Sequence, residues 1–350
     1  MEKERLVWID VLNIVACAGV LLLHCTNGQV HGFSGTPSVD WYIGLTTHSF
    51  FLWPVDVFFM ISGFTLVRAS ILTDNNNSGG VKRFYARRLK RLAIPLFAWN
   101  ILYMMQYLAK TYIEGSDILP VNELLTKFCL FGYNGFMWFF VPLILIYISL
   151  PFFAVFVLNS DRRLLRLFLT MGLILGCIPP LDSTFTTRCG LSDVYIMGSR
   201  FLYFIVAGYY IGNFDISRKI RRRLYACSVA SGIVMFVGTM CLTLYFPGHY
   251  RYFLAYTNIP CAITALGVFT FFKYHEWEKT LASVRLKAAD VARYSSFSLG
   301  IYLIQGAWFT VIGHFHVSDG NLMMKFVVMY VVCVTSIWIM KHIPVVKKIV

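Results

Sequence analysis

The chain has 350 residues, of which 58% are hydrophobic and only 14% are charged. This balance lies far from the average of soluble proteins and excludes an ordinary soluble domain. The formal charge of +14 has the sign expected of a nucleic-acid-binding protein, but no segment resembles a nucleic-acid-binding motif. We therefore interpret the excess of Lys and Arg as a signal of membrane topology and as an attraction to anionic lipid or to an anionic cytoplasmic ligand.

Ten apolar stretches with few charges follow one another along the chain. Such stretches predict membrane-spanning helices, which need about 20 residues. No connection between them exceeds about 25 residues, too short for a separate core, so we expect one transmembrane domain over residues 1–350. The predicted fold class is an all-α polytopic membrane protein with about ten transmembrane helices. The stretches cover residues 6–25, 50–71, 92–112, 136–158, 164–180, 196–214, 224–246, 253–273, 296–316 and 323–341.

The Lys and Arg residues are unevenly distributed over the connections. The two ends of the chain and alternate connections hold 25 of the 31, and the intervening connections hold the other six. Cytoplasmic loops of membrane proteins carry the excess of Lys and Arg. Both termini are therefore predicted to be cytoplasmic, in agreement with an even number of helices.

Few ionisable side chains fall near or within the predicted helices, and each is a functional candidate because its burial in a membrane is costly. At a rise of about 1.5 Å per residue, His24 should close the first helix at its outer end. Asp56 should lie at a similar depth in the second helix, which follows an outer loop over 28–47. A carboxylate beside an imidazole favours a general base; the alternatives are a buried pair that only orients two helices, or a His24 exposed at the interface. The candidates are Asp10, His24, Asp56 and Arg200.

A basic segment over residues 82–91 precedes the third stretch. On a helix, Arg91 shares a face with Arg87 and with Arg88, and such a cluster is suited to bind phosphates. The alternative is an ordinary cytoplasmic anchor with no ligand. Asp10, near the inner boundary, is expected to form an ion pair with this segment.

Other patterns predict packing rather than chemistry. Gly208 and Gly212 are four residues apart, a spacing that lets two membrane helices approach closely. The nine Cys residues show no C-x-x-C pair and no metal-ligand spacing, so no metal site is expected.

Several segments together resemble the acyltransferase-three family of integral membrane O-acyltransferases. The resemblance extends in order over nearly the whole chain, and its order and spacing are more specific than any one motif. The segments are Trp8 to Asn13 followed by His24; Pro54 to Phe64; Arg87 to Arg91 with Pro95; Met137 to Leu143 with Tyr147 and Pro151; Tyr203 to Gly212; and Ser298 to Ile304.

The resemblance implies transfer of an acyl group, usually acetyl, from cytoplasmic acyl-CoA to a hydroxyl group. The implied acceptor is an extracytoplasmic glycan, lipid-linked sugar or cell-wall polymer, which places the protein in a cell membrane of the bacterial cytoplasmic type. His24 matches the family's histidine and would act as general base, oriented by Asp56. The basic residue that precedes it by eleven positions in the family is Asn13 here, which puts that donor contact in doubt. A late histidine is replaced by Gln305, which cannot titrate.

In this scheme Arg87, Arg88 and Arg91 bind the phosphates of CoA, and Asn13 takes the position of a donor contact. Trp138 and the outer-loop Trp41 are candidates for stacking on a sugar, although aromatic residues also form belts at membrane interfaces.

Two other functions compete with acyl transfer. The departures at Asn13 and Gln305 favour a carrier or flippase for a small polar or lipid-linked molecule, whereas His24 and the basic segment favour an enzyme. A membrane module that serves a separate catalytic partner is a third interpretation. The sequence leaves self-association into a homo-oligomer open, and it indicates membrane lipid but no nucleic acid as a partner.

Overall fold

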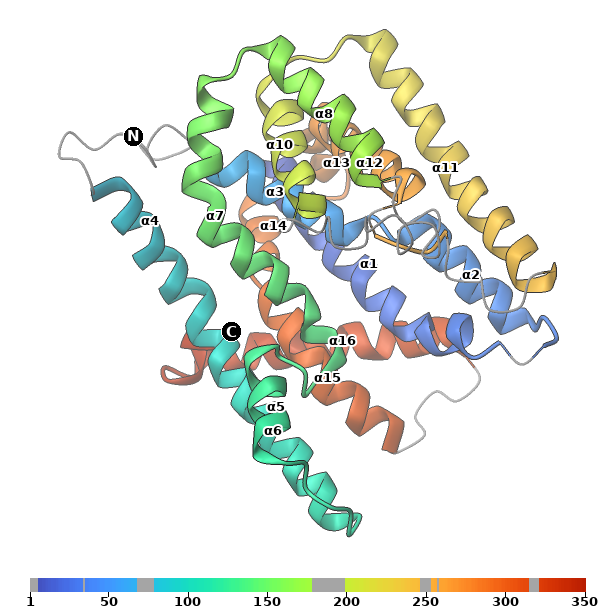
Figure 1. The fold of residues 1–350 in the computed structure, drawn as a ribbon, viewed down its shortest axis with the longest axis vertical. Coiled ribbons are helices and arrows are strands. Elements are labelled where there is room, and N and C mark those ends of the chain that lie inside the picture. The colour runs from blue at the N-terminus through green and yellow to red at the C-terminus, as the bar shows by residue number, and fades with distance from the viewer. Residues whose placement is uncertain are drawn as a thin grey trace. The chain divides into compact units, whose positions relative to one another are not determined.

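A computed structural model describes residues 6–33, 35–67, 79–177, 199–245, 253–256, 258–314 and 321–350. Every regular element within these ranges is a helix (Figure 1). Each of the ten predicted apolar stretches overlaps a helix, which confirms the all-α class. The chain is a polytopic integral membrane protein.

Six helical segments of the described ranges are long and apolar enough to cross a membrane, and a bent pair, Ala288–Ser295 with Ser298–Gly313, makes a seventh. Two further apolar helices, Phe201–Asn213 and Ile259–Tyr274, are shorter than this test requires. A count of ten spans and the cytoplasmic placement of both termini therefore stay predictions. The six segments are Val7–His31, Val39–Leu66, Gly79–Ile113, Gly135–Asn159, Arg218–Tyr245 and Leu322–His342.

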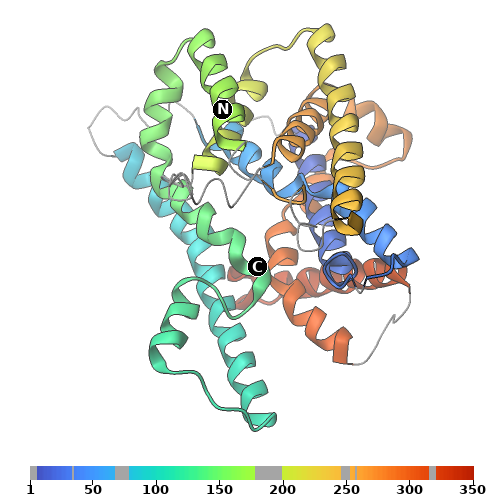
Figure 2. The ribbon, with the colours of Figure 1, turned by 45° about the vertical axis from the view of Figure 1, so that its right-hand side comes forward.

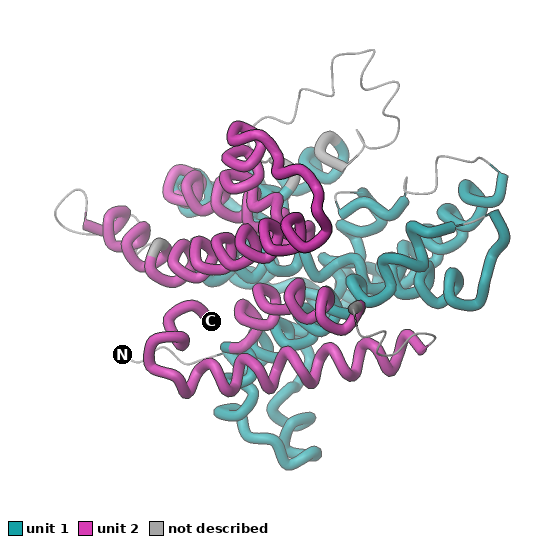
Figure 3. Tube along the Cα trace, turned by 90° about the horizontal axis from the view of Figure 1, so that it is seen from below, with its two compact units in different colours: residues 1–68, 155–296 teal, residues 69–154, 297–350 magenta. Residues whose placement is uncertain are grey.

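The chain forms two compact units, each built from two separate pieces of sequence (Figure 3). Unit 1 comprises Met1–Arg68 and Val155–Ser296, and unit 2 comprises Ala69–Ala154 and Phe297–Val350. Unit 1 contains α1 (Val7–His31), α2 (Val39–Phe51), α3 (Pro54–Leu66), α8 (Arg162–Cys177), α10 (Ser199–Asn213), α11 (Arg218–Tyr245), α12 (Ile259–Tyr274), α13 (Trp277–Ser283) and α14 (Ala288–Ser295).

The start of unit 1 differs from the sequence prediction. The outer loop expected over 28–47 is wrong, because α1 continues to His31 and α2 already begins at Val39. The Ser38 side chain accepts a hydrogen bond from the backbone N–H of Trp41 and so caps α2. Trp41, Leu45 and His48 are buried at helical spacing, and they bind α2 to α1. The chain then turns at Leu52 and Trp53 into α3.

The core of unit 1 contains a close crossing of α3 and α10. A Cβ atom added at Gly208 would overlap the backbone of Met60, and one added at Gly63 would overlap the backbone of Ile205. A Cβ atom at Gly212 would overlap the ring of Phe64. The small-residue face predicted at Gly208 and Gly212 is therefore confirmed as a packing surface.

In unit 2, α15 packs against α16 and also contacts α5. The Tyr103 hydroxyl donates to the Leu303 carbonyl over 2.5 Å, and the Asn100 amide donates to the Phe128 carbonyl over 2.8 Å. The second bond joins α5 to α6, which fold back on each other as a hairpin (Figure 2). The elements are α4 (Gly79–Arg88), a π-helical turn η2 (Leu89–Ala93), α5 (Ile94–Ile113), α6 (Val121–Cys129), η3 (Gly135–Phe139), α15 (Ser298–His314), α16 (Leu322–His342) and η7 (Val346–Lys348), and α7 (Phe140–Asn159) continues from unit 2 into unit 1.

Candidate active site

His24 lies on α1, seven residues before its end, and is half-buried. The sequence predicted that His24 closes the helix, and this prediction is wrong. The nearby imidazole of His48, on α2, is only 6% exposed. His48 forms a hydrogen bond with the backbone of Leu23 and interacts electrostatically with both His24 and His31. Its ring centroid lies 5.9 Å from that of His31, edge to face.

This histidine group, formed by His24, His31 and His48, was not found from the sequence. His48 falls between the loop predicted over 28–47 and the apolar stretch predicted over 50–71, and neither prediction indicated that its side chain is buried. The helical spacing of Trp41, Leu45 and His48 was the signal that would have placed its ring against α1. Within the part of the chain that the structure describes, no set of three or more His, Cys, Asp or Glu side chains is arranged to hold a metal ion.

Asp56 is fully buried in the first turn of α3. Its carboxylate accepts a hydrogen bond from the Cys261 thiol on α12 over 3.3 Å. Its Oδ1 atom has no hydrogen-bond partner among the described residues, and the role of Asp56 in orienting His24 stays a prediction. Asp56 was expected at the depth of His24 in a helix that follows an outer loop over 28–47, whereas the helical segment already begins at Val39.

Asn13 lies on α1, at the position where the resemblance implies a basic residue. Its side-chain amide donates to the Ser295 carbonyl over 2.9 Å and to the Ser295 hydroxyl over 3.0 Å. Asn13 thus ties α1 to the last residue of α14. Gln305 is buried on α15, where its amide donates to the Tyr302 carbonyl over 3.0 Å. Asp10 is buried on α1, and its ion pair with the 82–91 segment stays a prediction.

The basic segment is helical and contains an irregularity. Arg87 and Arg91 are exposed, and Arg88 is half-buried with its guanidinium carbon 5.9 Å from the centroid of the Phe84 ring. Arg91 lies in the π-helical turn η2, which precedes Pro95. A proline removes one helical hydrogen bond and crowds the carbonyl four residues earlier, and a π turn absorbs such a disturbance. Because this turn takes in an extra residue, it alters the face-sharing expected between Arg87 and Arg91.

The two tryptophans proposed to contact a sugar differ in exposure. Trp41 is only 3% exposed, and its ring packs between Phe33 and Tyr42 at centroid distances of 5.2 and 5.0 Å. Little of its surface remains for a sugar ring. Trp138, in η3, is half-buried and contacts Phe139 edge to face. Arg200 is the second residue of α10, but its side chain is outside what the structure describes.

The comparison with known families is decisive. A family model described as an acyltransferase domain, that of the acyltransferase-three family, matches residues 6–342. The chain belongs to this family. It is therefore a membrane acyltransferase, and an acyl donor and an acceptor follow from the family. No curated protein and no solved structure matched the chain.

Proposed function

We propose that this acyltransferase moves an acetyl group from cytoplasmic acetyl-CoA to a hydroxyl of an extracytoplasmic glycan, lipid-linked sugar or cell-wall polymer, in a membrane of the bacterial cytoplasmic type. The observation that carries the proposal is the half-buried imidazole of His24 within a long apolar helix. A titratable group in that position is costly unless it is used. His24 is also at the position that matches the family's histidine.

In the proposed reaction, His24 removes the proton from the acceptor hydroxyl while the oxygen attacks the thioester carbonyl. The tetrahedral intermediate collapses, the C–S bond breaks, and the CoA thiolate leaves and receives the proton from the imidazolium. The products are an acetyl ester and free CoA. A second route has the imidazole accept the acetyl group first and pass it to the hydroxyl. Both routes require the same neutral imidazole.

The other candidate residues have different roles in this proposal. His48 lies close enough to interact with His24 electrostatically and is suited to fix the orientation of the imidazole. Asp56, which binds Cys261, is proposed to act at a distance by holding α3 against α12. The Asn13 amide is committed to Ser295, which supports a structural role better than a donor contact.

The donor phosphates are proposed to bind to Arg87, Arg88 and Arg91. Guanidinium groups bind phosphate oxygens through paired charge-assisted hydrogen bonds, and the exposure of Arg87 and Arg91 leaves them accessible. Trp138, as the more exposed of the two candidate tryptophans, is proposed to contact the acceptor.

The test uses the full chain in lipid nanodiscs with acetyl-CoA labelled in the acetyl group. The wild type should release free CoA and transfer label to a membrane glycan fraction. His24→Ala should bind acetyl-CoA normally but lose transfer by about 10²–10⁴-fold, the usual contribution of a general base. His342→Ala, at an exposed histidine near the end of α16, is the matched control and should behave as the wild type.

Two results would contradict the proposal. Unchanged turnover of His24→Ala would remove the imidazole from the reaction. Unchanged acetyl-CoA affinity of the double variant Arg88→Ala, Arg91→Ala, at both low and high salt, would leave the basic segment as a membrane anchor only.

A further inference from the structure

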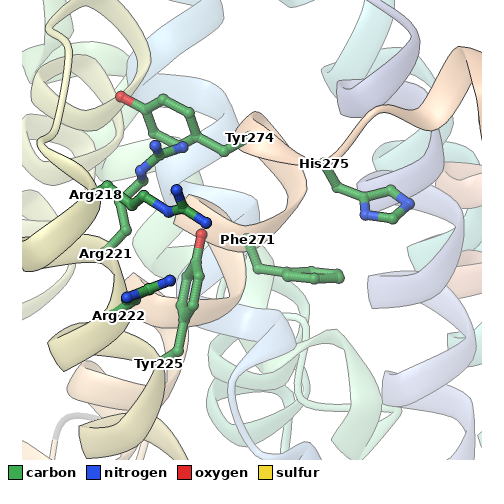
Figure 4. A pocket seen from close by; sticks show the side chains of 7 residues that line it. All are labelled: Arg218, Arg221, Arg222, Tyr225, Phe271, Tyr274 and His275. Carbon is green, nitrogen blue, oxygen red and sulfur yellow. The ribbon is translucent and has the colours of Figure 1, made fainter.

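A second group of arginines lines a pocket in unit 1. The pocket has a volume of about 260 Å³ and lies where the start of α11 meets the end of α12. Figure 4 shows the arginines of α11 facing the aromatic rings of α12. In the sequence these arginines counted only toward the membrane topology. The lining residues are Arg218, Arg221, Arg222, Tyr225, Phe271, Tyr274 and His275.

Arg221 is held in place by the aromatic wall. Its guanidinium carbon lies 3.9 Å from the centroid of the Tyr274 ring, a close cation–π contact. The Tyr274 hydroxyl donates to Asp215 over 2.7 Å and accepts from the backbone N–H of Ile216 over 2.6 Å. These bonds fix the ring, and the ring in turn orients Arg221. The Nε atom of Arg221 is buried and has no hydrogen-bond partner among the described residues.

The charge of the pocket is incompletely balanced. Asp215 interacts electrostatically with Arg221, but within the described ranges no ion pair or side-chain hydrogen bond involves Arg218 or Arg222. Both are exposed. The N-terminal end of α11, a helix of 28 residues, adds partial positive charge at the same place. The pocket therefore presents several guanidinium donors without a matching number of acceptors.

We propose that this pocket binds the phosphate group of a phosphate ester. The forked donors of arginine match phosphate oxygens, and the flat rings offer surface to the group that carries the phosphate. The volume is below the range of about 300–1,000 Å³ that holds a whole drug-sized ligand, so the pocket takes only part of a larger molecule. Two sources have this chemistry: the nucleotide portion of CoA, and the headgroup of an anionic phospholipid.

The experiment compares two double variants and one control in the full chain. Arg221→Gln with Arg222→Gln removes two pocket charges, and Arg223→Gln removes an exposed charge from the same helical turn outside the pocket. Arg222→Gln alone is the fallback if Arg221 is needed for folding, because Arg222 is exposed. The probes are CoA, titrated in neutral detergent, and nanodiscs containing either phosphatidylglycerol or only phosphatidylcholine. The second double variant, Arg88→Ala with Arg91→Ala, removes two charges from the basic segment. The CoA affinity that it loses is assigned to that segment and not to the pocket.

The pocket variant should lose about tenfold or more in affinity for one of the phosphate probes, while Arg223→Gln loses less than twofold. A loss confined to CoA identifies the nucleotide as the source, and a loss confined to phosphatidylglycerol identifies the lipid. Equal effects of the pocket variant and Arg223→Gln on both probes would overturn the proposal, because only the general surface charge would then matter. His24→Ala should retain the binding, so a failure of the catalytic proposal is distinguishable from a failure of this one.

Discussion

The histidine group and the arginine pocket, both in unit 1, are contrasting environments. His48 is almost fully buried and interacts with uncharged groups and other imidazoles, whereas Arg218 and Arg222 are exposed and surrounded by few acceptors. A buried group with few partners is suited to move a proton, because its surroundings fix its geometry and exclude water. An open cluster of fixed charges is suited to attract and hold an anion. In our proposals, the first region therefore serves the chemistry and the second serves binding.

Among the substitutions that test this contrast, the largest effect on activity is expected at His48. His48→Asn should lower the turnover number by about ten- to a hundredfold, less than the loss of the general base itself, because His24 loses a neighbour that orients it. The affinity for CoA should not change. The measurement is the pH profile of kcat/KM, whose acidic limb should move in the variant.

A purely structural role for His48 would lower the amount of folded protein without moving the pH profile. His342→Ala, at an exposed histidine, should move neither quantity. An unchanged pH profile in His48→Asn would mean that His48 takes no part in the reaction.

The next effect concerns the packing that holds the buried region rigid. Gly208→Ala should lower the free energy of unfolding by about 1–3 kcal/mol, because the added methyl group would overlap the backbone of Met60. Gly28→Ala is the matched control, since nothing lies within 4 Å of a Cβ atom at that position of α1. Thermal unfolding in nanodiscs measures both. Equal melting temperatures for the two variants would mean that the crossing of α3 and α10 tolerates more separation than the structure shows.

The helices themselves were largely predictable from the sequence, because long apolar stretches have few structural alternatives in a membrane. Gly208 and Gly212 were correctly interpreted as packing residues for a similar reason. The segment 28–47 was misjudged because Gly, Ser and Thr are typical of loops, although Trp41, Leu45 and His48 share one helical face. The prediction relied on the polar composition of the segment and overlooked this spacing.

The candidate site was only partly accessible from the sequence. His24 stands out as a titratable group in an apolar helix, but its neighbours depend on which helices pack together. The Cys261 partner of Asp56 is more than 200 positions away, and no local pattern indicates it. The arginines at the start of α11 were hidden for the opposite reason: a cytoplasmic connection is expected to be basic, so their number gave no sign of a pocket.

A smaller effect is expected at the join between α1 and α14. Asn13→Ala should lower the free energy of unfolding by about 1–2 kcal/mol, since it removes two hydrogen bonds to Ser295. The affinity for CoA should stay the same. Ser295→Ala removes only the hydroxyl acceptor and should cost less. A loss of CoA affinity in Asn13→Ala, with stability unchanged, would instead assign this position to the donor.

The smallest effect is expected at the arginine pocket, where Asp215 is exposed beside Arg221. The hydrogen bond from Tyr274 lowers the pKa of Asp215. The carboxylate therefore contributes stability at pH values above its unfolded pKa of about 4, and this contribution is lost as the pH falls through the lower pKa of the folded state.

At pH 7 Asp215 is fully charged, and its charge partly opposes the field of Arg221. Asp215→Asn should therefore tighten binding of the phosphate probe by about two- to threefold, in the range of a surface charge pair, and should change the melting temperature little. The gain should shrink as salt is raised, because exposed charges are screened. Weaker binding in Asp215→Asn would mean that the carboxylate acts mainly by positioning Tyr274, so that the shape of the pocket outweighs its charge.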